Sequence, residues 1–238
     1  MAFKTTFKRL EKKFILTEEQ YLAVKAAFED AFVPDRYGET TICNLYYDTA
    51  DYIMLRRSIS KPIYKEKIRL RTYGIPNDSS VSFIELKKKY EGVVYKRRIE
   101  LPYPDALDFL SKKLVPENQS QIMKELSFCL ERYEGLAPRF FISSERSAFF
   151  NKDNDEFRVT FDKNLTWRNY DLDLRKGVYG NNILPKGHVI MEIKIPHNLP
   201  LWIVQLFSRL GIKSGSFSKV GTAYSQMIKQ IGDYNNET

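Results

Sequence analysis

Several segments of this chain alternate between apolar and charged residues, and their charged positions are rich in lysine and arginine. The clearest case is the stretch YKEKIRLR at residues 64–71. Side chains of a β-strand point alternately to its two faces, so one face collects four cations: Lys65, Lys67, Arg69 and Arg71. Neighbours in this row are about 6.7 Å apart and repel by about 2.5 kcal/mol at an effective dielectric near 20. The row must face either bulk water or something strongly negative.

The same division into an apolar and an ionic face recurs in five other segments. In FIEL, for example, Ile84 and Leu86 alternate with Glu85. The ionic faces hold cations with interspersed acids: Arg9, Glu11 and Lys13; Glu85, Lys87 and Lys89; Lys96, Arg98 and Glu100; Glu156, Arg158 and Asp162; Glu192 and Lys194. A charged face on one strand is usually solvated, but its repetition over six strands favours a shared, ion-lined interior.

The pattern predicts eight strands separated by helices. Alternation indicates strands at residues 5–14, 41–48, 62–73, 81–90, 93–101, 138–149, 156–162 and 187–195. Helical patterns fall at residues 18–32, with Thr17 as the N-cap, and at 51–58, 104–113, 120–130, 199–210 and 220–231. No linker-like run divides the chain, so we expect a single α+β domain over residues 1–238, dominated by antiparallel strands.

Two architectures fit strands with one apolar and one ionic face. A sandwich would bury the apolar faces and leave the ionic faces in water. A closed barrel could instead turn its ionic faces inward around a wet lumen, with helices packed on the apolar outside. The six helical segments supply that cover, so we predict an eight-stranded antiparallel β-barrel whose basic interior binds a polyanion.

Composition agrees with an anionic partner and an intracellular setting. The chain has 38 Lys and Arg against 30 Asp and Glu, a net charge of +8. Cys43 and Cys129 fit no metal spacing and are predicted to be reduced thiols. Neither a secretion signal nor a run long enough to cross a bilayer is evident. We therefore expect a cytoplasmic protein without direct membrane insertion.

An ordered set of short motifs resembles one known family. The strings RLEKKF, NLYYDT, KEKIRLRTYG, FIELKKK, VVYKRR, RVTFD, MEIK and FSK follow one another between about residues 7 and 231. Each is weak alone, but their order resembles the polyphosphate polymerase domain of the vacuolar transporter chaperone (VTC) complex and its stand-alone bacterial relatives. That domain belongs to the CYTH-like triphosphate tunnel metalloenzymes.

The resemblance implies an eight-stranded tunnel barrel that transfers the γ-phosphate of ATP to inorganic polyphosphate with Mn²⁺ or Mg²⁺. The residues assigned to catalysis are Lys13, Arg69, Arg71, Lys87, Glu192 and Lys219. The residues assigned to phosphate binding are Arg9, Lys67, Lys96, Arg98, Arg146, Arg158, Lys194 and Ser218. The metal is assigned to Glu192, helped by Glu11 or Glu85.

Two positions depart from the family pattern. Ser144 stands where a tyrosine often precedes the arginine of the sixth strand, which removes a stacking partner for adenine. Ser216 stands where the eukaryotic enzymes have a lysine before the FSK motif, which removes one phosphate contact. Both bear on nucleotide choice and on polymerisation rather than on phosphate binding.

Alternative functions share the same ionic interior. A tunnel triphosphatase would use water as the attacking group, and a non-catalytic module would only bind polyphosphate. A nucleic-acid binder is disfavoured because the aromatic residues fall mostly on the apolar faces. We expect ATP and polyphosphate as partners, with a membrane protein needed for any transport of product. His188 and His197 are interpreted as structural or exposed, and Trp167 and Trp202 as core residues.

Overall fold

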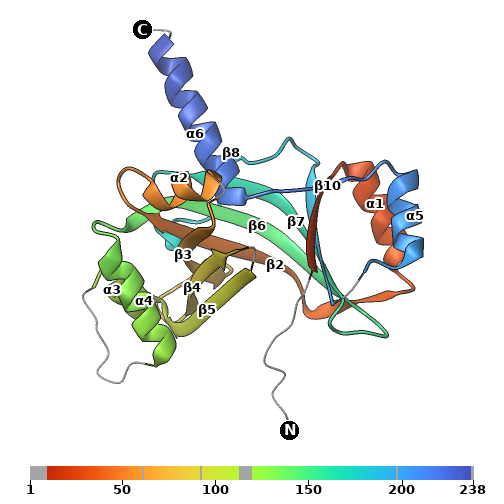
Figure 1. Ribbon diagram of the computed structural model, residues 1–238, viewed down its shortest axis with the longest axis horizontal. Helices are drawn as coiled ribbons and strands as arrows, with labels where there is room; N and C mark the ends of the chain where they lie inside the picture. The colour runs from red at the N-terminus through yellow and green to blue at the C-terminus, as the bar shows by residue number, and fades with distance from the viewer. Residues whose placement is uncertain (1–9, 61, 92, 113–119, 197, 237–238) are drawn as a thin grey trace. The chain divides into compact units, whose positions relative to one another are not determined.

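The computed structural model describes residues 10–60, 62–91, 93–112, 120–196 and 198–236 (Figure 1). Its strands are β1 (Leu10–Leu16), β2 (Phe32–Asp48), β3 (Tyr64–Tyr73), β4 (Val81–Tyr90), β5 (Val93–Pro102), β6 (Ala137–Asn151), β7 (Arg158–Arg168), β8 (Asn181–Asn182), β9 (Val189–Ile195) and β10 (Ser214–Gly215). Its helices are α1 (Glu18–Phe28), α2 (Ile53–Ile59), α3 (Tyr103–Leu110), α4 (Gln121–Arg132), α5 (Leu201–Arg209) and α6 (Lys219–Asn236), with a 3₁₀ turn η1 (Leu174–Lys176).

The strands form one sheet in the order β10-β1-β9-β7-β6-β2-β3-β4-β5, with β8 beside β7. The predicted α+β fold rich in antiparallel strands is confirmed. In the described part of the chain, however, the sheet is an open path of nine strands with β8 beside it, rather than a closed barrel of eight. Its end strand β10 has only two residues, which pair with Lys13 and Phe14 of β1, and no pairing joins it to β5 within the described residues.

The chain divides into two compact units. The first unit comprises Met1–Thr40, Ser144–Leu165 and Leu184–Phe217, and the second comprises Thr41–Ser143, Thr166–Ile183 and Ser218–Thr238. The strands β2, β6 and β7 each supply residues to both units. That residues 1–238 act as one domain stays a prediction.

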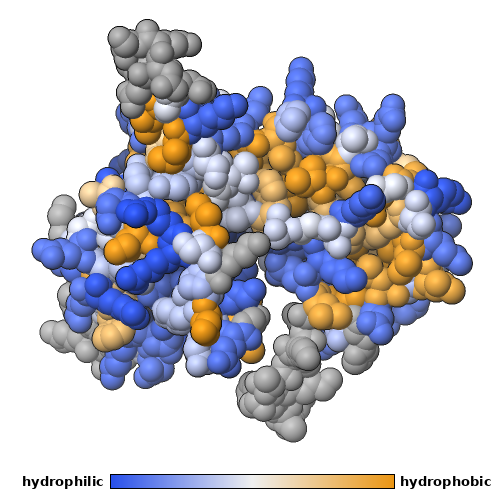
Figure 2. Space-filling model, turned by 45° about the horizontal axis from the view of Figure 1, so that its top comes forward, coloured by the Kyte–Doolittle hydropathy of each residue, from blue (hydrophilic) through white to orange (hydrophobic). Residues whose placement is uncertain are grey.

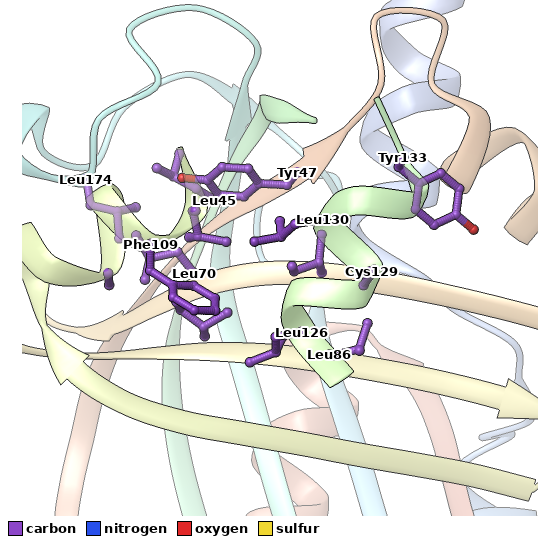
Figure 3. Close-up of a cluster of buried hydrophobic side chains, with 14 of the residues drawn as sticks. Leu45, Tyr47, Leu70, Leu86, Phe109, Leu126, Cys129, Leu130, Tyr133 and Leu174 are labelled. Atoms are coloured by element: carbon purple, nitrogen blue, oxygen red, sulfur yellow. The ribbon is translucent and has the colours of Figure 1, made fainter. Parts of the chain in front are cut away.

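In the second unit, α3 and α4 cover the apolar face of the strands. Leu45, Leu70 and Leu86 from the sheet pack with Phe109 and Leu126 from the helices (Figure 3). Complete burial of such side chains stabilises the fold by roughly 1.5–3 kcal/mol each. Because strand side chains alternate, this packing turns the charged positions of β3 and β4 to the opposite face.

In the first unit, α1 and α5 cover the apolar face in the same way. Phe14 of β1 meets Phe207 of α5 edge-on, with ring centroids 4.9 Å apart. Exposed apolar side chains remain on the outer surface of these helices, where Leu22 is 58% and Leu201 is 71% exposed. Figure 2 shows apolar residues gathered on the surface of this unit. The predicted arrangement of helices outside the apolar strand faces is therefore confirmed within each unit.

Local signals explain where α1 begins and ends. Thr17 accepts a hydrogen bond from the backbone N–H of Gln20, and the Gln20 side chain accepts one from the backbone N–H of Thr17. The helix ends at Phe28 rather than at residue 32, because Phe32 already belongs to β2 and packs between Phe28 and Phe157. The predicted N-cap is confirmed and the predicted C-terminus is wrong by four residues.

Cys43 and Cys129 are both free and buried. Burial raises the pKa of the Cys43 thiol to about 11 and that of the Cys129 thiol to about 12. None of the helices among the described residues combines the length and the apolar character needed to cross a membrane.

Candidate functional site

Three lysines stand side by side on the ionic face of the second unit. In the antiparallel register Lys67 of β3 lies opposite Lys87 of β4, and Lys87 lies opposite Lys96 of β5. Directly opposite residues have Cβ atoms about 4.5–5.5 Å apart, and like charges in these positions destabilise a sheet. The next cross-strand row on the same face consists of Arg69, Glu85 and Arg98.

The carboxylate of Glu85 is the centre of this cluster. Its Oε2 lies 2.6 Å from Nη2 of Arg69 and 3.8 Å from Nη1 of Arg71. Its Oε1 lies 2.7 Å from Nζ of Lys96 and 4.0 Å from Nε of Arg98. The Glu85 side chain is only 2% exposed. One buried carboxylate on β4 thus draws together cations from the two flanking strands, β3 and β5.

The electrostatics of Glu85 follow from this crowding. Burial alone raises the pKa of the carboxyl, but the charges of Arg69, Arg71 and Lys96 outweigh it and lower the pKa to about 2. Burial also lowers the pKa of the Lys96 ammonium more than the attraction of Glu85 raises it. The carboxylate is therefore firmly ionised, and the cations around it outnumber it.

Two polar residues of β2, which the sequence did not assign to the site, accept hydrogen bonds from the arginines of β3. The Tyr46 hydroxyl accepts a hydrogen bond from Nη1 of Arg69 at 2.9 Å, and Oδ1 of Asn44 accepts one from Nε of Arg71 at 2.9 Å. Asn44 in turn donates to the backbone carbonyl of Ile142 in β6. The NLYYDT motif could have indicated both residues, because alternation along a strand places Asn44 and Tyr46 on the face opposite the buried Leu45.

Ser218 and Lys219 of the FSK motif lie at the start of α6, in the second unit. Ser218 accepts a hydrogen bond from Nζ of Lys67 at 3.0 Å and one from the backbone N–H of Gly221 at 3.2 Å. The second bond makes Ser218 the N-cap of α6. Lys219, the first residue of the helix, is partly buried. The structure therefore brings the predicted residues Lys67, Ser218 and Lys219 together.

A second ionic cluster lies in the first unit around Glu192 of β9. Its carboxylate pairs with the ammonium of Lys194 and lies 3.8 Å from Nζ of Lys13, which is also 3.3 Å from Oε1 of Glu11. Burial alone raises the pKa of Glu192, but Lys194, Lys13 and Arg146 outweigh it and lower the pKa to about 2. These predicted residues share one ionic face of β1 and β9.

The remaining predicted cations of the first unit pair with acids that the sequence reasoning did not assign to the site. Arg146 binds Asp162 through two bonds of 2.7 Å, from Nε to Oδ1 and from Nη2 to Oδ2. Arg158 lies 3.5 Å from Asp35 and stacks over the Phe150 ring at 4.2 Å. Neither arginine is buried, so both can also reach an anion in solvent.

The donors around Glu192 suit a hard divalent cation. Glu192 and Glu11 offer carboxylate oxygens, and directly opposite Glu192 the buried hydroxyl of Thr160 has no hydrogen-bond partner among the described residues. Mg²⁺ prefers oxygen ligands and often takes one or two carboxylates together with substrate phosphates. In the described part of the chain, no three His, Cys, Asp or Glu side chains form a potential metal cluster. A role for Glu85 in metal binding stays a prediction, and its observed contacts are with cations.

The other predicted residues have simpler placements. Arg9 and His197 lie outside the described residues. Ser144 is 4% exposed, whereas Ser216 is exposed. The core assignment is confirmed for Trp167, which is 1% exposed, while Trp202 packs against Phe28 but is 40% exposed.

Comparisons with known proteins agree with this fold. The chain superposes on a candidate adenylate cyclase from Bacillus halodurans with a TM-score of 0.56 and 12% identity, over 88% of this chain and 93% of that one. It superposes on a candidate adenylyl cyclase from Hippeastrum, described as having a dominant triphosphatase activity, with a TM-score of 0.55 and 12% identity. That match covers 91% of this chain and 96% of the Hippeastrum chain. At such low identity these matches establish the fold, which is the predicted triphosphate tunnel fold.

A search of curated proteins finds no match to this chain. The VTC domain model, in contrast, matches residues 8–228, nearly the whole sequence. That span includes the strands that carry both ionic clusters, so the chain belongs to the VTC domain family.

Proposed function

We propose that this protein binds chains of phosphoryl groups on its ionic faces and synthesises inorganic polyphosphate from ATP. The observation that carries the proposal is the row formed by Lys67, Lys87 and Lys96 beside the Glu85 cluster. Lys87 lies directly opposite both Lys67 and Lys96, and like charges in such positions destabilise a sheet. A polyanion with closely spaced charges removes that repulsion and gains charge-assisted hydrogen bonds.

Such a surface suits phosphoryl transfer, because this reaction needs the reactants to be positioned and the charge on the phosphoryl oxygens to be neutralised more than it needs covalent participation by the protein. In the proposed reaction an oxygen at the end of the acceptor polyphosphate attacks the γ-phosphorus of ATP. The bond between that phosphorus and the β–γ bridging oxygen breaks, and ADP leaves. Arg69 and Arg71 would hold phosphoryl oxygens through their planar guanidinium groups. Lys87, Lys96 and Arg98 would neutralise the growing chain.

The basic residues of the first unit would bind phosphates in the same way. Lys13, Arg146, Arg158 and Lys194 are the candidates there, with Glu192 and Glu11 as the holders of Mn²⁺ or Mg²⁺. The ion, when bound, would neutralise charge on phosphoryl oxygens. ATP as the phosphoryl donor would place the reaction in the cytoplasm.

The test is incubation of the purified chain with ATP and Mn²⁺, followed by separation of the products on a gel. A ladder of long polyphosphate together with ADP is the expected result. Orthophosphate without a ladder would instead support hydrolysis. Unchanged ATP, combined with tight binding of added polyphosphate, would leave a binding module without catalysis.

Triphosphate hydrolysis is the second candidate. It is favoured by the superposition on the Hippeastrum protein, which is described as having a dominant triphosphatase activity. Ser144 and Ser216 also stand where the family pattern has a tyrosine and a lysine. Hydrolysis of inorganic tripolyphosphate in the same assay, at a rate above that of ATP consumption, would select this alternative.

A further inference from the structure

The guanidinium of Arg69 is held from two sides in the second unit. Its Nε donates to Oε2 of Glu85 at 2.7 Å, and its Nη2 lies 2.6 Å from the same oxygen. Its Nη1 donates to the Tyr46 hydroxyl at 2.9 Å, and its Cζ lies 5.7 Å from the centre of the Tyr46 ring. Tyr46 lies directly opposite Arg69 in the register of β2 and β3.

These contacts fix which N–H groups of Arg69 can meet a ligand. A guanidinium has five N–H donors in one plane. Glu85 takes the donor on Nε and one on Nη2, and Tyr46 takes one on Nη1. Within the described residues, one donor on each terminal nitrogen is then left for another partner. Donors on the two terminal nitrogens of a guanidinium form a fork that can bind a phosphoryl group through two hydrogen bonds.

We propose that Tyr46 is a positioning residue for phosphate binding, whose hydroxyl works with Glu85 to hold the Arg69 fork toward the phosphoryl chain. This inference rests on the proposed function, because it takes Arg69 as a phosphate ligand. Without the hydroxyl, Nη1 loses its acceptor, and only the two contacts with one oxygen of Glu85 hold the guanidinium in place. The fork would then meet the ligand in the right orientation for only part of the time.

The charges around Tyr46 make its role depend on pH. Lys67, Arg69 and Arg71 of β3 lie on the same face, with Glu85 of β4 and Lys96 of β5 beyond them and Lys219 following Ser218, the partner of Lys67. On the other side of β2 lies β6, where the uncharged residues Phe140 and Ile142 alternate with the core residue Phe141. Burial alone raises the pKa of Tyr46, but the three β3 cations and the hydrogen bond from Arg69 outweigh it and lower the pKa to about 8.

The direction of the pH effect follows from linkage. Loss of the Tyr46 proton places a negative charge beside Arg69 and cancels part of the positive field that attracts the ligand. A bound polyanion in turn disfavours the ionised phenol and raises the pKa of Tyr46. The affinity for a polyanion should therefore fall as the pH rises through about 8. With phenylalanine at this position, that fall should be absent.

The experiment is calorimetric titration of the full chain with inorganic tripolyphosphate between about pH 6.5 and about pH 9, a window that brackets the Tyr46 pKa of about 8. Tyr46→Phe should bind roughly tenfold more weakly than the unmodified chain near the lower limit, the expected loss for one hydrogen bond to a charged group. The two affinities should converge near the upper limit. The absorbance of tyrosinate should also show one tyrosine ionising near pH 8 in the unmodified chain but not in Tyr46→Phe.

Tyr95→Phe is the matched control, since Tyr95 is an exposed tyrosine of β5 in the same unit. It should leave both the affinity and its pH profile unchanged. A Tyr46→Phe profile parallel to that of the unmodified chain would overturn the inference and leave phosphate binding intact. No binding of tripolyphosphate by the unmodified chain at any pH would overturn the inference together with the proposed function.

Discussion

At the scale of single residues, the negative charge of the Glu85 carboxylate reduces the repulsion between the cations of the second unit. A buried carboxylate is costly unless it is paired, and here four cations lie within 4.0 Å of its oxygens. The sequence predicted this mixture, because alternation put Glu85 on the same face as Lys87 and placed the cations on flanking strands. It could not show which acid pairs with which base, since that depends on strand register.

The first prediction concerns Arg69. Arg69→Ala should lower the rate of ATP consumption roughly a hundredfold, because it removes a preorganised donor to the transferred phosphoryl group. Steady-state assays with ATP and Mn²⁺ would measure the loss. Arg97→Ala is the control, since Arg97 pairs with Glu125 of α4. Full activity in Arg69→Ala would remove Arg69 from the site.

The second prediction concerns acid and Glu85. The folded pKa of about 2 lies below the ordinary value of 4.5, so the carboxylate stabilises the fold fully above pH 4.5. This contribution declines below pH 4.5 and is lost as the pH falls through about 2. Such a shift of the pKa corresponds to roughly 3 kcal/mol in the free energy of unfolding.

Urea unfolding of the unmodified chain and Glu85→Gln over this acid range would measure that contribution. At neutral pH the variant should be less stable by about 3 kcal/mol, the loss for breaking a buried ion pair. The gap should shrink as the pH falls from 4.5 toward 2. A gap that stayed constant over this range would contradict the low pKa of Glu85.

At the scale of elements, strands with a clean alternation were predicted well. β4 has the predicted bounds, and β3 and β5 end within two residues of them. The first half of β2 was missed because Pro34 and Gly38 suggest a loop, and Gly38 has a positive φ of 60°. The two-residue strands β8 and β10 are too short to show an alternation of apolar and polar residues. Their existence depends on the neighbours with which they pair.

The third prediction tests the start of α1. Thr17→Ala removes the hydroxyl that accepts from the Gln20 backbone, and should lower the free energy of unfolding by about 1 kcal/mol. Thr17→Ser keeps that acceptor and should cost much less. Equilibrium unfolding in urea would measure both changes. Equal losses in the two variants would point to the missing methyl group rather than to the cap.

At the scale of the whole molecule, the three shared strands bear on how the chain unfolds. Because β2, β6 and β7 each belong to both units, a break in one of them removes backbone hydrogen bonds from both. The alternation of residues along each strand is visible in the sequence. The division into units is not, since each unit is assembled from three separate stretches of chain.

The fourth prediction is that both units unfold together in denaturant. The chain has two tryptophans, Trp202 in the first unit and Trp167 in the second. Trp202→Phe and Trp167→Phe each leave one fluorescent reporter. When each fluorescence transition is compared with the circular dichroism of the same variant, the two should coincide. Separate transitions would mean that the units unfold independently.

The burial of both cysteines has a practical consequence. Thiolates rather than thiols react with maleimides and methanethiosulfonates, and pKa values of about 11 and 12 keep Cys43 and Cys129 protonated in neutral buffer. A cysteine introduced at an exposed position of each unit could therefore carry a spin label without prior removal of the native ones. Pulsed electron resonance on such doubly labelled protein would then report distances between the units with and without polyphosphate.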